Sequence, residues 1–339
     1  MAERAPDAPA GGVRAVTVTA GEAELRLDRW FKRHFPGLSH GRLEKLLRKG
    51  QIRVDGKRAK SGQRLVAGQI IRVPPMGAAR QQQTDSRSAA VSDGDAQVLH
   101  DAVLYRDEFV IAINKPPGLA VQGGTGTRRH LDGMLDALRF GSSERPRLVH
   151  RLDRDTSGVL ILGRTAAATA ALSRSFRQRS ARKLYWAVTV GTPAPHAGRI
   201  DQALAKGTVR GGERMMAAET EETGRQGRKA VTLYRVIEHA GKEAALVALS
   251  PLTGRTHQLR VHLAGRSTPI LGDGKYGGSD AFLPGRKAKL HLHARRLVMP
   301  IDGGKTLDIA APPPPHMIET FRFFGFGTKG ADALLTEDE

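Results

Sequence analysis

Residues 149–162 read VHRLDRDTSGVLIL and place two carboxylates among several cations, directly before an aliphatic run. Asp153 and Asp155 stand two positions apart, with Arg151 and Arg154 beside them. A cation within ~4–6 Å favours the ionised form of a carboxyl group, so such an aspartate suits a nucleophile or a base better than a general acid. A surface ion-pair cluster that shapes a turn is the competing interpretation, and these residues alone leave both open.

The segment around these aspartates is expected at the edge of a sheet. Residues 159–162 are short and aliphatic, whereas residues 150–156 show no apolar periodicity. We therefore predict a loop from His150 to Thr156 that presents its side chains where a buried strand begins. Asp155 directly precedes Thr-Ser-Gly, where a short carboxylate commonly caps a turn, and this favours a structural role for it.

A tyrosine occupies a second segment that is able to take part in chemistry. In KLYWAVTV (183–190), the large apolar side chains alternate and are predicted to take the core side of a strand. Tyr185 then faces the other way with Ala187 and Thr189, whose small side chains leave room for a base to stack on its ring. A plain sheet tyrosine is the alternative.

An arginine lies on the apolar face of a predicted helix, THQLRVHLAG (256–265), which Gly265 ends. His257, Arg260 and Ala264 recur at helical spacing, so Arg260 shares its face with small or apolar residues. An arginine in such a place is usually paired with a carboxylate. Arg255, in the preceding TGRTHQ, is expected to contact a polyanionic partner or to brace the loop.

The composition points to a polyanionic partner. Lys and Arg total 54 against 34 Asp and Glu, which gives a net charge of +20 and a pI near 10.8. Like charges repel in the compact state, so this excess indicates nucleic acid first and an anionic membrane surface second. No stretch reaches the ~18 apolar residues of a membrane span, the first residues lack the apolar core of a signal peptide, and cysteine is absent. We expect a cytoplasmic protein that binds nucleic acid.

The chain divides by composition into a small basic unit and a larger domain. We predict a disordered tail at 1–20, a compact unit at 21–75, a flexible linker at 76–101, the larger domain at 102–325 and a loose tail at 326–339. The basic unit reads as two short helices, the second capped by Ser39 and ended by Gly50, followed by a hairpin at Asp55-Gly56 and a further strand.

In the larger domain, strands and short helices alternate without the regular spacing of repeated βαβ units. Residues 109–114 suit a buried strand that ends at Pro116-Pro117-Gly118. We therefore predict an α+β fold with a mixed, largely antiparallel sheet rather than a doubly wound one. The chain has no GxxxxGK[ST] phosphate loop, which argues against a nucleotide cofactor.

The larger domain resembles the RluA-type RNA pseudouridine synthases, enzymes that isomerise uridine in RNA to its carbon-linked form. The matching segments follow the family's order and extend over roughly 102–325. They are AINKPPGL (112–119), HRLDRDTSG (150–158), KLYWAVTVG (183–191), KAVTLYRV (229–236), SPLTGRTHQLRVHL (250–263), TPILGDGKYG (268–277) and LHLHARRL (290–297). The resemblance implies the pseudouridine synthase fold, an isomerase activity, and no need for a metal or other cofactor.

The resemblance also implies roles for individual residues. By position, Asp153 is the catalytic aspartate, and Arg151 enters the RNA stack in place of the flipped base. Tyr185 stacks on the uracil and serves as a proton acceptor, while Arg260 pairs with Asp153 and keeps it ionised. Leu292 is the apolar contact to the target base. Base flipping itself is a physical requirement, because the reacting atoms are inaccessible inside a helix.

The basic unit resembles the small RNA-binding module of the S-four protein of the small ribosomal subunit. The features that match are LDRWFKRHFP, SHGRLEKLLRKGQIRVDGK and AGQIIRV. The resemblance places the second helix and the hairpin against RNA, with six cations near phosphates: Arg42, Lys45, Arg48, Lys49, Lys57 and Arg58. A solvated basic face without a fixed partner is the alternative.

The favoured hypothesis is a pseudouridine synthase acting on ribosomal RNA, the large subunit preferred, with tRNA as an alternative substrate. A non-catalytic ribosome-assembly factor and an acid–base hydrolase using Asp153 with His150 or His257 are the rivals. His291 and His293 lie two apart on a predicted strand, but no acid adjoins them, so they are expected to be structural rather than metal ligands.

Overall fold

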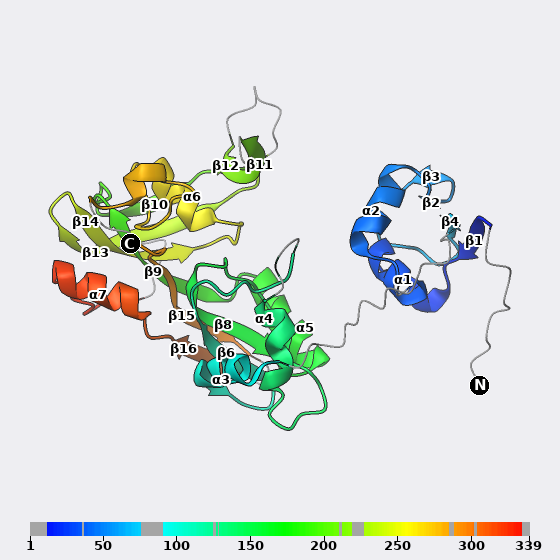
Figure 1. Ribbon diagram of the computed structural model, residues 1–339, viewed down its shortest axis with the longest axis horizontal. Helices are drawn as coiled ribbons and strands as arrows, with labels where there is room; N and C mark the ends of the chain where they lie inside the picture. Colours follow the sequence, from blue (N-terminus) through cyan, green and yellow to red (C-terminus); the bar gives the residue numbers. More distant parts are fainter. Residues whose placement is uncertain are drawn as a thin grey trace. The chain divides into compact units, whose positions relative to one another are not determined.

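A computed structural model describes residues 12–35, 37–75, 91–124, 127, 129–209, 212–218, 227–284, 288–301 and 304–333. The chain divides into two compact units, residues 1–90 and 91–339 (Figure 1). Within the described ranges, no helix combines the length and the apolar character that crossing a bilayer requires.

The first unit packs two helices on a small antiparallel sheet whose strand order is β1-β4-β2-β3. Its helices are η1 (Ala20–Glu22, a 3-10 turn), α1 (Leu27–His34) and α2 (His40–Arg48). Its strands are β1 (Arg14–Thr17), β2 (Arg53–Val54), β3 (Lys57–Arg58) and β4 (Ile70–Val73). Trp30 and Phe31 of α1 are fully buried at the centre of its core.

Local sequence signals account for the ends of these elements. Ser39 caps α2 by accepting a hydrogen bond from the backbone N–H of Arg42 at 3.4 Å. Asp55 (φ +48°) and Gly56 (φ +73°) both adopt the left-handed backbone that a two-residue hairpin needs between β2 and β3. The predicted helices, cap and hairpin are confirmed.

The expectation of a disordered tail at 1–20 is wrong for its second half. β1 pairs with β4 from Arg14 opposite Val73 to Thr17 opposite Ile70, and Val18 is buried against the same core. Residues 1–11 lie outside the described residues. The Ala-, Gly- and Pro-rich composition concealed this strand because its stabilising partner comes more than fifty residues later.

The second unit is built on a ten-stranded sheet that is antiparallel except where β15 meets β8 (Figure 1). Its main path runs β10-β13-β14-β9-β15-β8-β6-β5, with β16 beside β15 and β7 beside β8, and β11 and β12 form a separate hairpin. The first strands along the chain are β5 (Val103–Arg106), β6 (Val110–Lys115), β7 (Arg147–Leu148), β8 (Ser157–Gly163), β9 (Arg182–Val190) and β10 (Ala197–Asp201). The later strands are β11 (Leu204–Val209), β12 (Gly212–Ala217), β13 (Val231–Ala240), β14 (Ala244–Pro251), β15 (Leu292–Pro300) and β16 (Thr306–Ala310).

Short helices complete this unit and confirm the predicted α+β class with a mixed, largely antiparallel sheet. They are α3 (Asp93–Asp101), α4 (Leu131–Met134), η2 (Leu135–Leu138), α5 (Ala166–Arg177), α6 (Gln258–Gly265), η4 (Gly278–Ala281) and α7 (Pro315–Phe324). The β11–β12 hairpin projects from the rest of the unit near α6 (Figure 1).

The described parts of two segments predicted to be loose belong to this unit, whereas residues 76–90 and 334–339 of these segments lie outside the described residues. Residues 93–101, assigned to the linker, form α3, which Ser92 caps and which buries Leu99 against α4 and η2. In the C-terminal tail, Phe326 and Ala331 are buried, and the Trp186 indole N–H donates to the carbonyl of Ala331 at 2.9 Å. Both segments are anchored by a few apolar contacts to distant elements, which a local count of polar residues does not detect.

Strand β9 is buried on both faces, which corrects the sequence prediction. Trp186 and Val188 pack on one side in a cluster that includes Met317 of α7. On the other side Ala187 is fully buried with Leu259 and Leu263 of α6. The face that was expected to leave room for a base is therefore covered by α6 at Ala187, whereas Tyr185 on the same face is only partly buried.

Candidate active site

The loop 149–156 joins β7 to β8 and presents Asp153 at the edge of the sheet. Every residue of β8 is buried, so the loop emerges from a rigid strand, and the Thr156 N–H closes a turn on the Asp153 carbonyl at 3.2 Å. The Asp153 side chain keeps 25% of its surface exposed. It is therefore held in place and still accessible to a substrate.

A buried lysine holds this loop through hydrogen bonds to backbone carbonyls. The Lys115 ammonium, at the end of β6, donates to the carbonyls of Pro116, Leu119 and Arg154 at 2.8, 3.0 and 2.9 Å. Burial lowers the pKa of Lys115 to about 7, although Asp155 and Asp153 act in the opposite direction. Sequence analysis gave this residue no role, and its only signal was a lysine ending an apolar strand.

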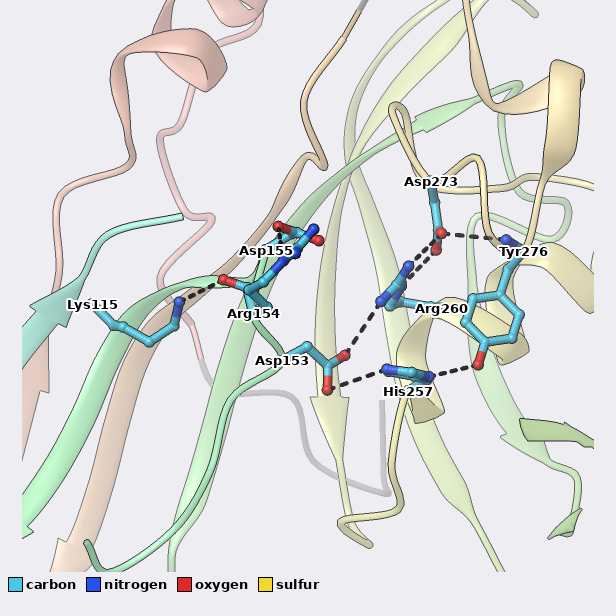
Figure 2. A network of polar contacts seen from close by, with 8 residues as sticks. All are labelled: Lys115, Asp153, Arg154, Asp155, His257, Arg260, Asp273 and Tyr276. Carbon is cyan, nitrogen blue, oxygen red and sulfur yellow. Dashed lines mark hydrogen bonds and ion pairs between the residues drawn. The ribbon is translucent and has the colours of Figure 1, made fainter. Parts of the chain in front are cut away.

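Arg260 is buried and shared between two carboxylates. Its Nε and Nη2 donate to Asp273 at 2.8 and 2.6 Å, and its Nη1 lies 3.7 Å from Asp153 Oδ2 (Figure 2). The predicted pairing with Asp153 is thus present, but the stronger partner is Asp273. Burial opposes the charge on Arg260, yet the hydrogen bonds to Asp273 and the charges of both acids raise its pKa. Asp273 was missed by sequence analysis, although TPILGDGKYG was among the matching segments.

A histidine approaches the other oxygen of the same aspartate. His257 Nε2 lies 3.7 Å from Asp153 Oδ1, and its Nδ1 lies 2.6 Å from the hydroxyl of Tyr276 (Figure 2). Tyr276 and Asp273 come from one short segment, in which the Tyr276 N–H donates to Asp273 at 3.3 Å. The two oxygens of Asp153 therefore face two different basic side chains.

Tyr185 lies beside this group on β9. Burial, together with the nearby negative charge of Asp153, raises the pKa of its phenol above the ordinary value. Its ring packs against both the cluster that contains Leu152 and the cluster that contains Leu292. Leu292 is itself 97% buried, in register with Ala187, so it lies in the sheet below the site.

The remaining charges of the loop point elsewhere. Arg154 pairs with Asp155 at 3.2 Å, an exposed contact next to the turn. Arg151 is exposed, and its guanidinium forms no hydrogen bond or ion pair with any described residue. Arg255 donates to the Lys229 carbonyl at 3.0 Å, so it braces the start of α6.

The histidines considered as metal ligands are engaged with protein groups. His291 bonds to the Lys289 carbonyl and the Thr320 hydroxyl, and His293 to the Ser157 hydroxyl and the Ala311 carbonyl. Burial lowers the pKa of each to about 4. Both imidazoles are neutral: His293 connects β15 to β8 and to Ala311, and His291, directly before β15, connects to α7.

In the first unit, the six cations expected near RNA are all exposed. Arg42, Lys45 and Arg48 lie on α2, Lys49 ends it, and Lys57 and Arg58 form β3. Arg58 lies next to the end of α2. Its Nε is 3.5 Å from the position that a Cβ on Gly50 would occupy. These six exposed cations of α2 and the hairpin are called the basic surface of this unit below.

Comparison with known proteins identifies both units. Residues 109–265 match the model of the RNA pseudouridylate synthase family, and residues 25–71 match the S4 domain. The chain is 35% identical over 310 residues to ribosomal large subunit pseudouridine synthase C of Escherichia coli, covering 88% of this chain and 93% of that protein. It is 34% identical over 323 residues to an uncharacterised RNA pseudouridine synthase of Synechocystis, covering 90% of each.

The fold agrees with this relationship. The solved structure of human RNA pseudouridylate synthase domain containing 4 superposes with a TM-score of 0.56 at 29% identity, covering 68% of this chain and 95% of that chain. Identity of about a third maintained over nearly the whole of both proteins shows common descent. The chain therefore belongs to the RNA pseudouridine synthase family, whose members are isomerases, and carries an S4 domain at its N-terminal end.

Proposed function

We propose that this protein converts specific uridines of large-subunit ribosomal RNA to pseudouridine, with Asp153 as the catalytic carboxylate. The observation that carries this proposal is the environment of Asp153. It is a partly exposed acid whose two oxygens face Arg260 and His257, with the ring of Tyr185 nearby. Basic side chains that face both oxygens restrict the orientation of the carboxylate, and a fixed orientation is what a nucleophile or base aimed at one bond requires.

The isomerisation requires few protein groups besides the Asp153 carboxylate. The bond between uracil N1 and the ribose breaks, the base rotates, and a bond forms between its C5 and the same ribose carbon. The C5 proton leaves and N1 takes up a proton, so the product is an isomer of the substrate. Asp153 starts the detachment, either by attack on the nucleoside or by removing a ribose proton. Tyr185 is proposed to stack on the uracil, because its raised pKa keeps the phenol uncharged.

The target nucleotide must leave the RNA helix to reach Asp153. Arg151 stands two residues before Asp153, exposed and without a partner among the described residues. Its guanidinium is proposed to fill the space that the flipped base leaves, since a planar cation stacks well on bases. The basic surface of the S4 domain is proposed to hold a neighbouring part of the same RNA through its phosphates.

Two different observations support ribosomal RNA as the proposed substrate. The first support is the S4 domain, whose exposed cations are proposed to hold RNA. The curated relatives from Escherichia coli and Yersinia pestis are named for the large ribosomal subunit.

The test replaces Asp153 by Asn in cells and maps pseudouridine in their rRNA and tRNA by carbodiimide modification and primer extension. Asp153→Asn is expected to abolish one or more rRNA sites, because the amide is neither nucleophile nor base. Asp155→Asn, two residues away, is the matched control and keeps them. Persistence of every site in an Asp153→Asn strain without a wild-type copy contradicts the proposal. Loss of tRNA sites in place of rRNA sites reassigns the substrate.

A further inference from the structure

His257 occupies an unusual backbone position directly before α6. Its φ of +54° and ψ of 20° lie in the left-handed region, which few side chains tolerate. The segment thereby turns the imidazole toward Asp153 from one side while Arg260, one turn further along, reaches it from the other (Figure 2). Backbone strain of this kind tends to occur where geometry serves function.

The hydrogen bond to Tyr276 defines which imidazole nitrogen carries the proton. Burial raises the pKa of the Tyr276 phenol, so its hydroxyl keeps its proton and is available to donate. The hydroxyl lies 2.6 Å from His257 Nδ1, and if it donates there, a neutral imidazole carries its proton on Nε2. The Nε2–H then points toward Asp153 Oδ1.

The charges around His257 favour this neutral form. Burial lowers the pKa of His257. This effect is larger than the opposite effect of the negative charge on Asp153, in the loop before β8. Arg260 from α6 and Lys275 from the following loop lower the pKa further, whereas Asp273 raises it. The guanidiniums of Arg214 and Arg260 lie over the Tyr276 ring at 4.8 and 5.1 Å and hold the phenol in place.

We propose that His257 is a positioning residue for this reaction. Its Nε2–H orients one oxygen of Asp153 while Arg260 holds the other, and Tyr276 selects the imidazole tautomer that makes this possible. The inference rests on the proposed function, because it takes Asp153 as the reacting group. The separation of 3.7 Å exceeds a hydrogen bond, and contacts of this kind commonly tighten only when substrate fills the site.

Two substitutions separate this role from a structural one. His257→Gln places an amide N–H where Nε2 stands, whereas the shorter Asn replaces only Nδ1 and leaves Asp153 without its donor. His257→Asn is expected to lower kcat by about 100-fold with little change in KM, and His257→Gln to keep kcat within about tenfold of wild type. A merely structural role predicts the reverse order, because Asn tolerates the left-handed backbone better than Gln.

The rates are measured on full-length protein as tritium release from a large-subunit rRNA transcript made with uridine tritiated at carbon-5. Wild type and Asp153→Asn are assayed in parallel. Release by wild type that Asp153→Asn lacks supports the proposed function. Equal rates for the Gln and Asn variants, or a faster Asn variant, overturn the role of His257 alone. Failure of wild type to release tritium contradicts the rRNA assignment instead.

Imidazole NMR tests the tautomer without depending on catalysis. In protein labelled with ¹⁵N-histidine, the His257 signals are identified as those lost in His257→Gln. They are expected to report a protonated Nε2 in wild type and a mixture of tautomers in Tyr276→Phe, which lacks the hydroxyl donor. A protonated Nδ1 in wild type overturns the proposal whatever the rates.

Discussion

Asp273 holds Arg260 through two hydrogen bonds, of 2.8 and 2.6 Å, and leaves the third guanidinium nitrogen facing Asp153 at 3.7 Å. Asp273 is fully buried and the Arg260 side chain nearly so, whereas Asp153 is partly exposed. The buried acid thus fixes the cation, and the cation in turn faces the accessible acid. A bidentate pair is well suited to this, because its planar geometry allows one orientation.

Asp273→Asn is expected to lower kcat by about 100-fold, because an amide accepts only one of the two N–H donors and Arg260 loses its fixed orientation. Breaking the buried pair is also expected to destabilise the catalytic unit by about 3–5 kcal/mol. Tritium release and denaturant unfolding measure the two effects. Asp280→Asn, an exposed acid in the same region, is the control and keeps both values. Unchanged kcat in Asp273→Asn contradicts the positioning of Arg260.

Lys115→Met is expected to remove a pH dependence of stability. The pKa of Lys115 is lowered to about 7 in the folded protein from its ordinary value of 10.5, so the unfolded chain binds more protons between these values. Stability therefore rises with pH across this window, by at most about 1.4 kcal/mol per pH unit. Denaturant unfolding of wild type and Lys115→Met compares the slopes. Identical slopes show that Lys115 titrates normally.

Gly158→Ala is expected to prevent normal assembly of β8 and β15. Gly158 has a φ of +108°, and a Cβ there meets the Ala294 carbonyl oxygen at 2.2 Å. Overpacking and backbone strain together are expected to cost more than about 2 kcal/mol. Thermal unfolding measures the loss. Gly254→Ala, where a Cβ meets nothing within 4 Å, is the control. An unchanged melting temperature in Gly158→Ala contradicts this close approach.

The exposed cations of the S4 domain are expected to act through phosphate contacts. A triple variant, Lys45→Ala, Arg48→Ala and Lys57→Ala, is expected to weaken rRNA binding and reduce the slope of log Kd against log salt by about 2 to 3. The catalytic unit keeps its kcat at saturating RNA. Removing three exposed cations of the other unit, Lys305, Arg322 and Lys329, provides the charge-matched comparison. Equal slopes in the two variants show that only net charge matters.

The sequence by itself determined the local features of this protein. Ser39 as a cap, the Asp55-Gly56 turn and the alternation around Tyr185 identified elements because each depends on neighbouring residues. The ordered motifs identified the family and the catalytic candidate Asp153. The mixed sheet also followed, since irregular spacing of strands and helices excludes repeated parallel units.

The tertiary structure decided which side chains surround Asp153. Lys115 reaches the carbonyl of Arg154 across 39 residues, and His257 reaches Asp153 across more than a hundred. Asp273 accepts two hydrogen bonds from Arg260, although Arg260 was expected to pair with Asp153. The same reason explains β1, whose partner β4 is distant in sequence. Local patterns specify which residues form a helix, strand or turn, whereas burial and pairing between distant elements select the partners of each polar group.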